Sequence, residues 1–450
     1  MEIQLYNGLH DRLETFKPIQ PGKVSMYVCG PTVYDYVHIG NLRPLVVFDV
    51  LKKLLIALGY QVHHVSNYTD IDDRIIEKAQ KEKVDEMTIS QRYIKAYQQD
   101  VAKMNALLPN QTPTVTEHLP AMIAFIAKLI QDGFAYKTSS GDVFFRVEKV
   151  KNYGQLSHID LHENKIGARV EANPEKENPF DFALWKHTTS GIKFTAPFGE
   201  GRPGWHTECV VMIKETFNQT LIDIHGGGFD LKFPHHENEM AQAQAAYQSH
   251  LANYWLHNGF INLNAEKMSK STGNTGNIFL AKNFLATYSG PLLRYILLAT
   301  HYRMPVNISQ LIIDNAQQEL KKIQIGIAHL ASFIQLHGGS VFPQKGIAPQ
   351  AFLAALADDI NTSNALTILH QHVKETQALL RQPQTLLEPL LNRFFTIQAM
   401  LSILGLAIEF TILTKEDHQL YKDYVSAKSN QNFGRSDEIR KILHQRNILF

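Results

Sequence analysis

Two stretches of the chain alternate apolar strand patterns with helical patterns, in residues 1–116 and again in residues 201–260. The first stretch holds the apolar run Val24 to Val28, a turn at Gly30-Pro31, and then leucines and valines at helical spacing from Leu42 to Leu58. Strands that alternate with helices in this way are typical of parallel sheets covered by helices on both faces. The pattern therefore predicts an α/β fold, in which two halves form one Rossmann-like, doubly wound parallel sheet.

The rest of the chain follows other patterns. Residues 117–200 contain short apolar and aromatic runs and a polar stretch with prolines, and they lie between the two predicted sheet halves. From Ser309 onward, long helical periods predict an all-α bundle, in which Asp358 to Thr362 reads as a capped turn between helices. We predict boundaries at 1–116 and 201–260 for the sheet, 117–200 for the insertion, 261–310 for a connecting region, 311–405 for the bundle and 406–450 for a small C-terminal domain.

Composition and charge narrow the class of protein. The formal net charge is +1, which argues against a wholesale polybasic nucleic-acid binder, although residues 421–450 carry a local excess of three positive charges. The chain contains no uncharged apolar run of about 18 residues, and Met1 to His10 does not read as a signal peptide. We therefore expect a cytoplasmic protein that is not bound to a membrane.

Two short segments together predict a site for the phosphates of ATP. His38-Ile39-Gly40-Asn41 stands at the predicted strand-to-helix junction, where free backbone N–H groups and the helix dipole attract anions. Gly40 would let a nucleotide approach closely, and His38 and Asn41 can donate hydrogen bonds. Lys267-Met268-Ser269-Lys270-Ser271 places two lysines in a predicted loop of the kind that closes on a charged transition state. Either segment alone would more often be an ordinary helix start or a surface loop.

Two cysteines, Cys29 and Cys209, are too few for a disulfide framework. A third polar cluster begins at Pro234, a residue suited to a first helical position, so that His235 and Glu239 lie four residues apart on one helix face. Two thiolates, an imidazole and a carboxylate would make a four-coordinate Zn²⁺ site. The alternative is that both cysteines are small buried hydrophobic residues.

Two further segments carry polar or glycine-rich ends. Ile222 to Asp230 reads as an apolar strand that ends in a glycine turn, where Gly226, Gly227 and Gly228 would let a nucleotide lie against bare backbone and Asp230 could bind ribose hydroxyls. Another strand precedes Asn67 to Asp73, in which Thr69 and Asp72 fit a helix-capping pattern. Lys232 occupies a position expected to be apolar, and the sequence offers no explanation for it.

The two nucleotide segments, in this order and with metal-type residues between them, resemble the signatures of class I aminoacyl-tRNA synthetases. Over nearly its whole length the chain is similar to the cysteinyl-tRNA synthetase family. The resemblance implies that L-cysteine is activated with ATP and then transferred to the 3′-terminal adenosine of tRNA(Cys). It also implies one Zn²⁺ per chain, which selects cysteine through its thiolate, and Mg²⁺ bound with ATP. The signature usually ends in His, whereas this chain has Asn41, which cannot carry a positive charge.

The resemblance also implies roles for individual residues. It makes region 261–310 a contact for the tRNA acceptor stem and region 406–450 an anticodon-binding domain, with an aromatic side chain for base stacking. The predicted catalytic residues are His38, Asn41, Lys267 and Lys270. The predicted ATP contacts are Gly40, Gly226, Gly227, Gly228, Asp230 and Lys270. The predicted cysteine contacts are Thr69, Trp205 and His225. The predicted metal ligands are Cys29, Cys209, His235 and Glu239, with His236 and Glu237 as possible substitutes. The predicted anticodon contacts are Lys428, Phe433 and Asp437.

Two other functions stay open at this point. A paralogous ligase would make the same cysteinyl adenylate but pass the cysteine to an amino sugar. The helical bundle and the basic C-terminal segment favour tRNA as the acceptor. A non-catalytic zinc and RNA-binding regulator would not need both nucleotide segments. The sequence does not specify the oligomeric state, and a monomer is the simplest expectation.

Overall fold

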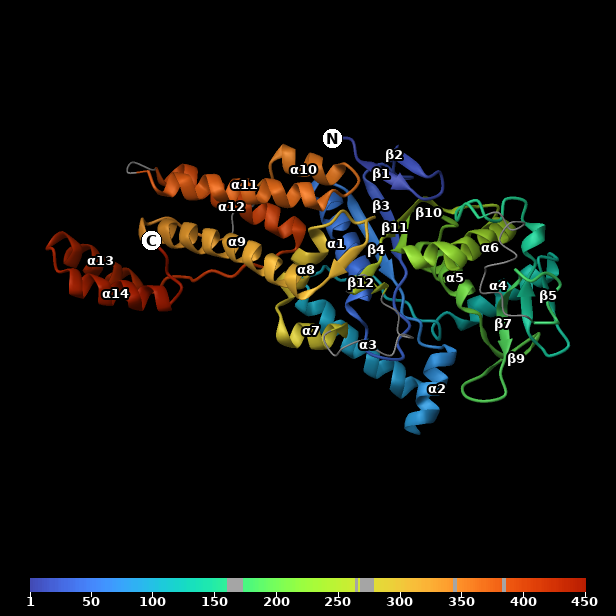
Figure 1. The fold of residues 1–450 in the computed structure, drawn as a ribbon. Helices are drawn as coiled ribbons and strands as arrows, with labels where there is room; N and C mark the ends of the chain where they lie inside the picture. The colour runs from blue at the N-terminus through green and yellow to red at the C-terminus, as the bar shows by residue number, and fades with distance from the viewer. Residues whose placement is uncertain (160–172, 264–265, 268–278, 343–345, 383–385) are drawn as a thin grey trace. The chain divides into compact units, whose positions relative to one another are not determined.

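The computed structural model describes residues 1–159, 173–263, 266–267, 279–342, 346–382 and 386–450 (Figure 1). It divides into two compact units. The first comprises Met1–Thr287 and Arg303–Val306, and the second comprises Tyr288–Tyr302 and Asn307–Phe450.

A parallel sheet forms the centre of the first unit. Its strands are β3 (Lys23–Val28), β4 (Gln61–Ser66), β10 (Leu221–Gly228) and β11 (Leu251–Asn258), in the order β11-β10-β3-β4. Two strands come from each of the segments that the sequence pattern singled out, so the predicted doubly wound α/β fold is confirmed. The two halves meet where β3 pairs with β10, and ligands of such sheets bind at the carboxyl ends of the strands at this kind of junction.

Helices cover both faces of this sheet (Figure 1). On one face, Tyr27 belongs to a buried apolar cluster with residues of α5 (Trp205–Phe217) and α6 (Glu237–Tyr247). On the other face lies α1 (Leu42–Ala57), whose Phe48 is fully buried against β10. The sheet is therefore buried on both sides, which explains the continuous apolar runs of its strands.

The predicted glycine turn after β10 is wrong. Gly226, Gly227 and Gly228 lie inside the strand and pair in parallel register with residues of β11. A Cβ atom at Gly226 would lie 2.1 Å from Cζ of Phe48, so the absence of a side chain lets the aromatic ring pack directly on the strand backbone. The glycines signal a close packing contact here, which a single sequence does not distinguish from a turn.

The insertion consists of one helix and an antiparallel sheet. Helix α4 (Leu119–Gln131) precedes five strands in the order β5-β6-β7-β9-β8. These strands are β5 (Ala135–Lys137), β6 (Val143–Phe145), β7 (Phe182–His187), β8 (Phe194–Ala196) and β9 (Gly199–Pro203). Other elements of the first unit are the hairpin β1 (Gln4–Asn7) and β2 (Arg12–Thr15) and the helices α2 (Asp73–Glu82), α3 (Glu86–Lys103) and α7 (Ala281–Thr287). Short 3₁₀ helices are η1 (Ile39–Asn41), η2 (Val147–Lys149) and η4 (Phe229–Leu231), and strands β12 (Ile261–Leu263) and β13 (Glu266–Lys267) pair in antiparallel register.

The second unit is helical, as the pattern after Ser309 predicts. After the short strand β14 (Val306–Ile308), its helices follow the chain as α9 (Gln310–Leu336), α10 (Gln350–Ala357), α11 (Thr362–Leu380), α12 (Leu387–Leu404), α13 (Lys415–Ser429) and α14 (Phe433–Gln445), with α8 (Gly290–Leu298) before them. The Asn361 side chain accepts a hydrogen bond from the backbone N of Asn364 at the start of α11, so the predicted capped turn is confirmed. None of the helices in the described ranges combines the length and the hydropathy that a bilayer crossing requires.

Candidate metal centre and active site

Four predicted ligands come together at the carboxyl edge of the sheet. Cys29 directly follows β3, and its backbone N donates to O of Gly226 at 3.1 Å. Its Sγ lies 3.7 Å from Sγ of Cys209, which α5 presents from its first two turns. Nε2 of His235 lies 3.8 Å from the Cys209 sulfur and 2.8 Å from Oε1 of Glu239. One donor atom from each of these four residues lies within 4.8 Å of all the others, so the group could hold a metal ion.

A second set of ligands shares the same space. Cys29, His225, His236 and Glu239 also bring their donor atoms within 4.8 Å of one another. The set with two thiols suits Zn²⁺ better, because soft thiolate ligands favour this metal. In that arrangement Nε2 of His225, 2.6 Å from Oε2 of Glu239, would hold the carboxylate in place from behind.

The structure answers one question that the sequence left open, the position of Glu237. Its carboxylate accepts hydrogen bonds from the backbone N of Gly154 at 2.8 Å and of Ser157 at 2.6 Å. Glu237 therefore fastens the backbone of the insertion and is in neither group of ligands. His236 stays close to the cluster, with Nε2 at 3.3 Å from the sulfur of Cys29.

The predicted helix start at Pro234 is wrong by three residues. Helix α6 begins at Glu237, after a short helical segment, η5 (Lys232–His236), in which Phe233 is extended and the Phe233–Pro234 peptide is cis. His235 and Glu239 nevertheless meet, as their spacing predicts. Lys232 is half buried, and this burial lowers its pKa.

The two thiols share one hydrogen bond and titrate differently. Burial opposes ionisation of Cys29, but the hydrogen bond from Cys209 and the neighbouring His236 and His225 outweigh it, so the pKa of Cys29 lies well below its ordinary value. The same hydrogen bond, together with burial, raises the pKa of Cys209 well above its ordinary value. These neighbours therefore favour the thiolate form of Cys29, the form that binds metals, and the thiol form of Cys209.

The imidazole and the carboxylate of the cluster shift each other's pKa toward the charged form. Burial would lower the pKa of His235, but Glu239 raises it to about 10. Burial and Cys29 would raise the pKa of Glu239, yet His235 and His225 lower it to about 2. The pKa shifts thus favour a charged imidazole beside a charged carboxylate in this cluster. A divalent cation would replace protons on the imidazole and on the second thiol.

Trp205 lies beside this cluster at the first position of α5. Its ring stacks on the His235 ring, with centroids 4.0 Å apart and planes at 19°, and the residue is 39% exposed. An exposed tryptophan beside buried polar groups offers an apolar wall for a small ligand. His225, a second predicted contact for the amino acid, is fully buried and bonded to Glu239.

Thr69, the third predicted contact, is buried and donates its hydroxyl to Oε2 of Glu208 at 2.6 Å. It does not cap α2, because that role belongs to Asp72, whose side chain accepts from the backbone N of Arg74. The predicted capping pattern of Thr69 with Asp72 is therefore wrong, because Asp72 itself is the N-cap of α2. Burial raises the pKa of Glu208 well above its ordinary value.

Sequence reasoning missed three polar residues around the cluster, of which Glu208 and His257 are buried and His206 is partly exposed. Nδ1 of His206 lies 3.1 Å from Nδ1 of His235, Nε2 of His257 lies 2.8 Å from Nδ1 of His236, and Glu208 receives the bond from Thr69. His206 and Glu208 share one short segment with Trp205 and Cys209, and this proximity was an available signal. His257 stands in β11 without any local signal.

The predicted phosphate-binding turn lies at the start of α1, as expected. The Asn41 amide oxygen accepts from the backbone N of His38 at 3.2 Å, and N of Asn41 donates to O of His38 at 2.9 Å, so asparagine closes this turn. A Cβ atom at Gly40 would lie 2.8 Å from Nδ1 of His38, so any other residue here would displace the His38 ring. Asp230 is exposed just beyond β10. Lys270 lies outside the described residues, and Lys267 is described only as a backbone position in β13.

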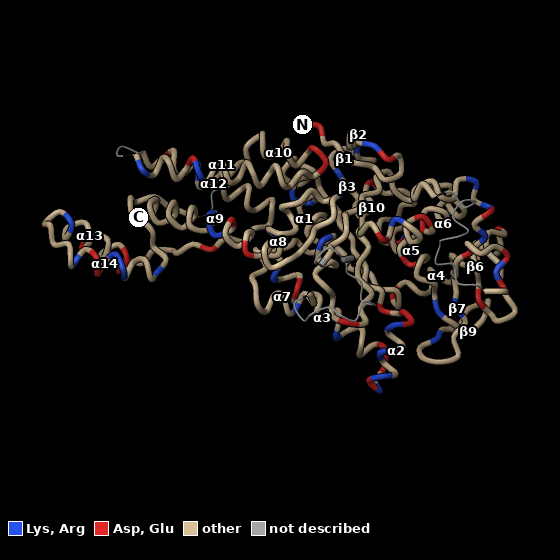
Figure 2. The backbone as a smooth tube through the Cα atoms, in the orientation of Figure 1, with Lys and Arg blue, Asp and Glu red and all other residues tan. Residues whose placement is uncertain are grey.

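The predicted anticodon residues lie on the last two helices of the second unit. Phe433 begins α14 and is 64% exposed, Nζ of Lys428 lies 5.7 Å from the Tyr424 ring, and Asp437 pairs with Arg440 at 2.9 Å. Figure 2 shows that basic and acidic residues are interspersed along α13 and α14. An exposed aromatic ring is the kind of side chain on which nucleic-acid bases stack.

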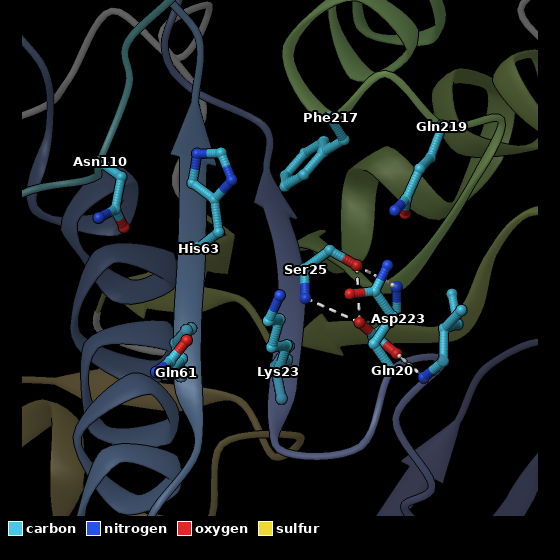
Figure 3. Close-up of a pocket in the computed structure, with 12 residues that line it drawn as sticks. Gln20, Lys23, Ser25, Gln61, His63, Asn110, Phe217, Gln219 and Asp223 are labelled. Atoms are coloured by element: carbon cyan, nitrogen blue, oxygen red, sulfur yellow. Dashed lines mark hydrogen bonds between the residues drawn. The ribbon is translucent and has the colours of Figure 1, made fainter.

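A separate cavity of about 320 Å³ opens near the amino ends of β3 and β4 (Figure 3). The carboxylate of Asp223 is saturated there by N of Ile19, N of Ser25 and Oγ of Ser25, at 2.6–2.7 Å. His63 faces Phe217 across it, with ring centroids 5.0 Å apart. None of the residues that line it belongs to the cysteine and histidine cluster, so it is not the candidate site.

Known proteins are similar to this chain in sequence and in fold. The family model described as "tRNA synthetases class I (C) catalytic domain" matches residues 15–318, and the model described as "DALR domain" matches residues 351–408. Relatives named "Cysteine--tRNA ligase" from Shouchella clausii and Exiguobacterium sibiricum are 42% and 43% identical, covering 99% of this chain and 97% of each relative. A methionyl-tRNA synthetase structure from Mycobacterium tuberculosis has a TM-score of 0.61 at 14% identity, covering 91% of this chain and 94% of that chain.

The parallel sheet, its insertion and the family match define an enzyme of the class I aminoacyl-tRNA synthetases. The cysteine and histidine cluster lies within the matched residues. Within that class, the chain belongs to the cysteine–tRNA ligase family, as identity over almost its whole length shows. The family that the sequence motifs indicate is thereby confirmed.

Proposed function

We propose that this enzyme activates L-cysteine with ATP and transfers the cysteinyl group to the terminal adenosine of tRNA(Cys). The observation that carries the proposal is the meeting of Cys29, Cys209, His235 and Glu239 beside the exposed ring of Trp205. The names of the relatives support the same substrates. The position at the junction between the two sheet halves is where this fold class binds its ligands.

The four donor groups fit Zn²⁺. Two thiols, an imidazole and a carboxylate are the ligand types of zinc sites, and all four are pre-assembled. When bound, the metal supplies a soft Lewis acid that prefers a thiolate to a serine hydroxyl. A site that demands one particular polar partner discriminates by roughly 10⁴ to 10⁵ without editing.

The remaining residues bind and position. In the first step the carboxylate of cysteine displaces pyrophosphate at the α-phosphate of ATP, a reaction that depends mostly on positioned charge. We assign His38, Asn41 and the backbone at Gly40 to the phosphates, Gly226, Gly227, Gly228 and Asp230 to the nucleoside, and Lys267 and Lys270 to the developing charge. Mg²⁺ accompanies ATP. Thr69, Trp205 and His225 surround the amino acid.

One experiment separates this function from the two alternatives. The zinc-loaded protein is incubated with labelled cysteine, ATP and either total tRNA or an amino sugar, and the labelled product is identified. We expect labelled tRNA, together with cysteine-dependent exchange of pyrophosphate into ATP. Label in the amino sugar alone would identify the paralogous ligase. No exchange in zinc-replete protein would identify a non-catalytic regulator.

Phe433→Ala tests the proposed tRNA contact. Because the ring is 64% exposed, its removal should leave stability unchanged, whereas loss of one base-stacking contact of about 1–3 kcal/mol should lower kcat/KM for tRNA charging roughly 5- to 150-fold. Pyrophosphate exchange should be unaffected. Val425→Ala on α13, 44% exposed, is the matched control and should charge tRNA normally. Normal charging by Phe433→Ala would exclude the stacking role.

A further inference from the structure

Three buried polar side chains connect the neighbours of the two cysteines. The backbone N of Gly30, directly after Cys29, donates to Oδ1 of Asn67 at 2.9 Å. Nδ2 of Asn67 donates to Oγ1 of Thr69 at 3.4 Å, and the Thr69 hydroxyl donates to Glu208, directly before Cys209, at 2.6 Å. Asn67, Thr69 and Glu208, here called the buried relay, are 2%, 1% and 1% exposed.

The buried relay begins next to one thiol and ends next to the other. Gly30 is pressed against this loop, because a Cβ atom there would lie 1.6 Å from the backbone O of Asn67. Backbone bonds of 3.2–3.3 Å from N of Val33 to O of Thr69 and from N of Thr69 to O of Pro31 hold the two segments together. The Thr69 hydroxyl then joins this loop to α5. The residues next to both cysteines therefore bond to the same short loop, which follows β4.

Burial of a carboxylate and two polar side chains costs free energy unless each has a hydrogen-bond partner. Each hydrogen bond of the buried relay also requires a particular orientation of its two partners. Groups that hold a metal ligand from behind fix its position, and their loss typically costs 10- to 100-fold in metal affinity. A site that is already assembled loses less conformational freedom when the metal binds. The sulfurs of Cys29 and Cys209 lie 3.7 Å apart in this structure, within reach of a single ion.

We propose that Asn67, Thr69 and Glu208 are positioning residues of the metal centre, which set the separation of Cys29 and Cys209 before the metal arrives. The inference rests on the metal centre proposed above. It gives Thr69 a role that is independent of its predicted contact with the amino acid, and it assigns Asn67 and Glu208 roles that the sequence did not suggest.

The test measures metal affinity in the absence of cysteine, ATP and tRNA. Metal-free protein is titrated with Co²⁺, whose thiolate charge-transfer absorption reports on the two sulfurs, and Zn²⁺ affinity is then measured by competition with a chelator. Thr69→Val keeps the shape but removes the hydroxyl, so affinity should fall about 10- to 100-fold, with a weaker charge-transfer band. Thr69→Ser keeps the hydroxyl and should bind within about threefold of the wild type.

Two further comparisons separate positioning from stability. Thr362→Val removes a hydroxyl that is equally buried, at 2% exposure, and that donates to O of Leu298 at 2.7 Å in the second unit. It should cost about 1 kcal/mol of stability and leave Co²⁺ binding unchanged. At the other end of the relay, Glu208→Gln keeps an oxygen acceptor for Thr69, whereas Glu208→Leu has none. Only the leucine variant should lose affinity.

Co²⁺ affinity is compared between Thr69→Ser and Thr69→Val, and between Glu208→Gln and Glu208→Leu. Only variants that circular dichroism shows to be folded are compared. Equal Co²⁺ affinity and equal spectra within a folded pair overturn the inference, and loss in the Val and Leu variants alone supports it. If one variant does not fold, the other pair decides. Absence of Co²⁺ and Zn²⁺ binding by the wild type would be a different result, because it would reject the metal centre itself.

Discussion

Cys209→Ser should leave the purified protein without bound zinc and reduce cysteine activation at least a hundredfold. The serine hydroxyl is a hard, neutral donor where the wild type offers a soft sulfur 3.7 Å from Cys29 and 3.8 Å from His235. Loss of a direct ligand should exceed the roughly 10- to 100-fold cost typical of outer-shell groups. Metal content by mass spectrometry and cysteine-dependent pyrophosphate exchange measure the two effects.

The matched control also buries a new hydroxyl, but away from the ligands. Ala243→Ser changes a fully buried residue of α6 and should retain both zinc and activity. Metal-free Cys209→Ser protein that activates cysteine at the wild-type rate would contradict the thiolate mechanism. Equal losses in both variants would mean that any polar substitution in this core is harmful and that sulfur is not special.

Gly30→Ala should lower the free energy of unfolding of the first unit by about 3 kcal/mol or more. The added Cβ atom would lie 1.6 Å from the carbonyl O of Asn67, and a backbone atom cannot move aside as a flexible side chain can. The chain must therefore shift at Cys29 or at the buried relay. We also expect weaker metal binding. All three tryptophans lie in the first unit, so their fluorescence in a urea titration follows this unit specifically.

Gly434→Ala is the corresponding control in α14. A Cβ atom there meets nothing within 4 Å, and alanine favours a helix over glycine by about 1 kcal/mol. The tryptophan-monitored transition should be unchanged by this substitution. If Gly30→Ala unfolds at the wild-type urea concentration and binds zinc normally, the close approach between Gly30 and Asn67 does not matter in solution.

Sequence patterns predicted the structure correctly where it depends on interactions between residues close together in the chain. The parallel strands of the sheet, the helix after His38 and the capped turn at Asn361 follow from side-chain period and from capping chemistry, which act over a few residues. The pairing of His235 with Glu239 also follows from spacing alone. Errors appear where a distant partner intervenes. The glycines that suggested a turn lie in a strand, where the Phe48 ring packs on Gly226. The Thr69 hydroxyl, which the pattern assigned to a helix cap, donates to Glu208 instead.

The amino-acid sequence alone specified the kind of chemistry. It supplies two thiols, an imidazole and a carboxylate four residues apart, and motifs that place the chain in its family. Only the folded chain decided which neighbouring side chains take part. In the folded chain Glu237 bonds to the insertion, His236 lies near the Cys29 sulfur, and Asn67, Thr69 and Glu208 connect the residues next to the two cysteines. The reason is physical. Residue type and spacing fix what a side chain can donate or accept, whereas its partner, often more than a hundred residues away, is set by the packing of the whole sheet and its helices.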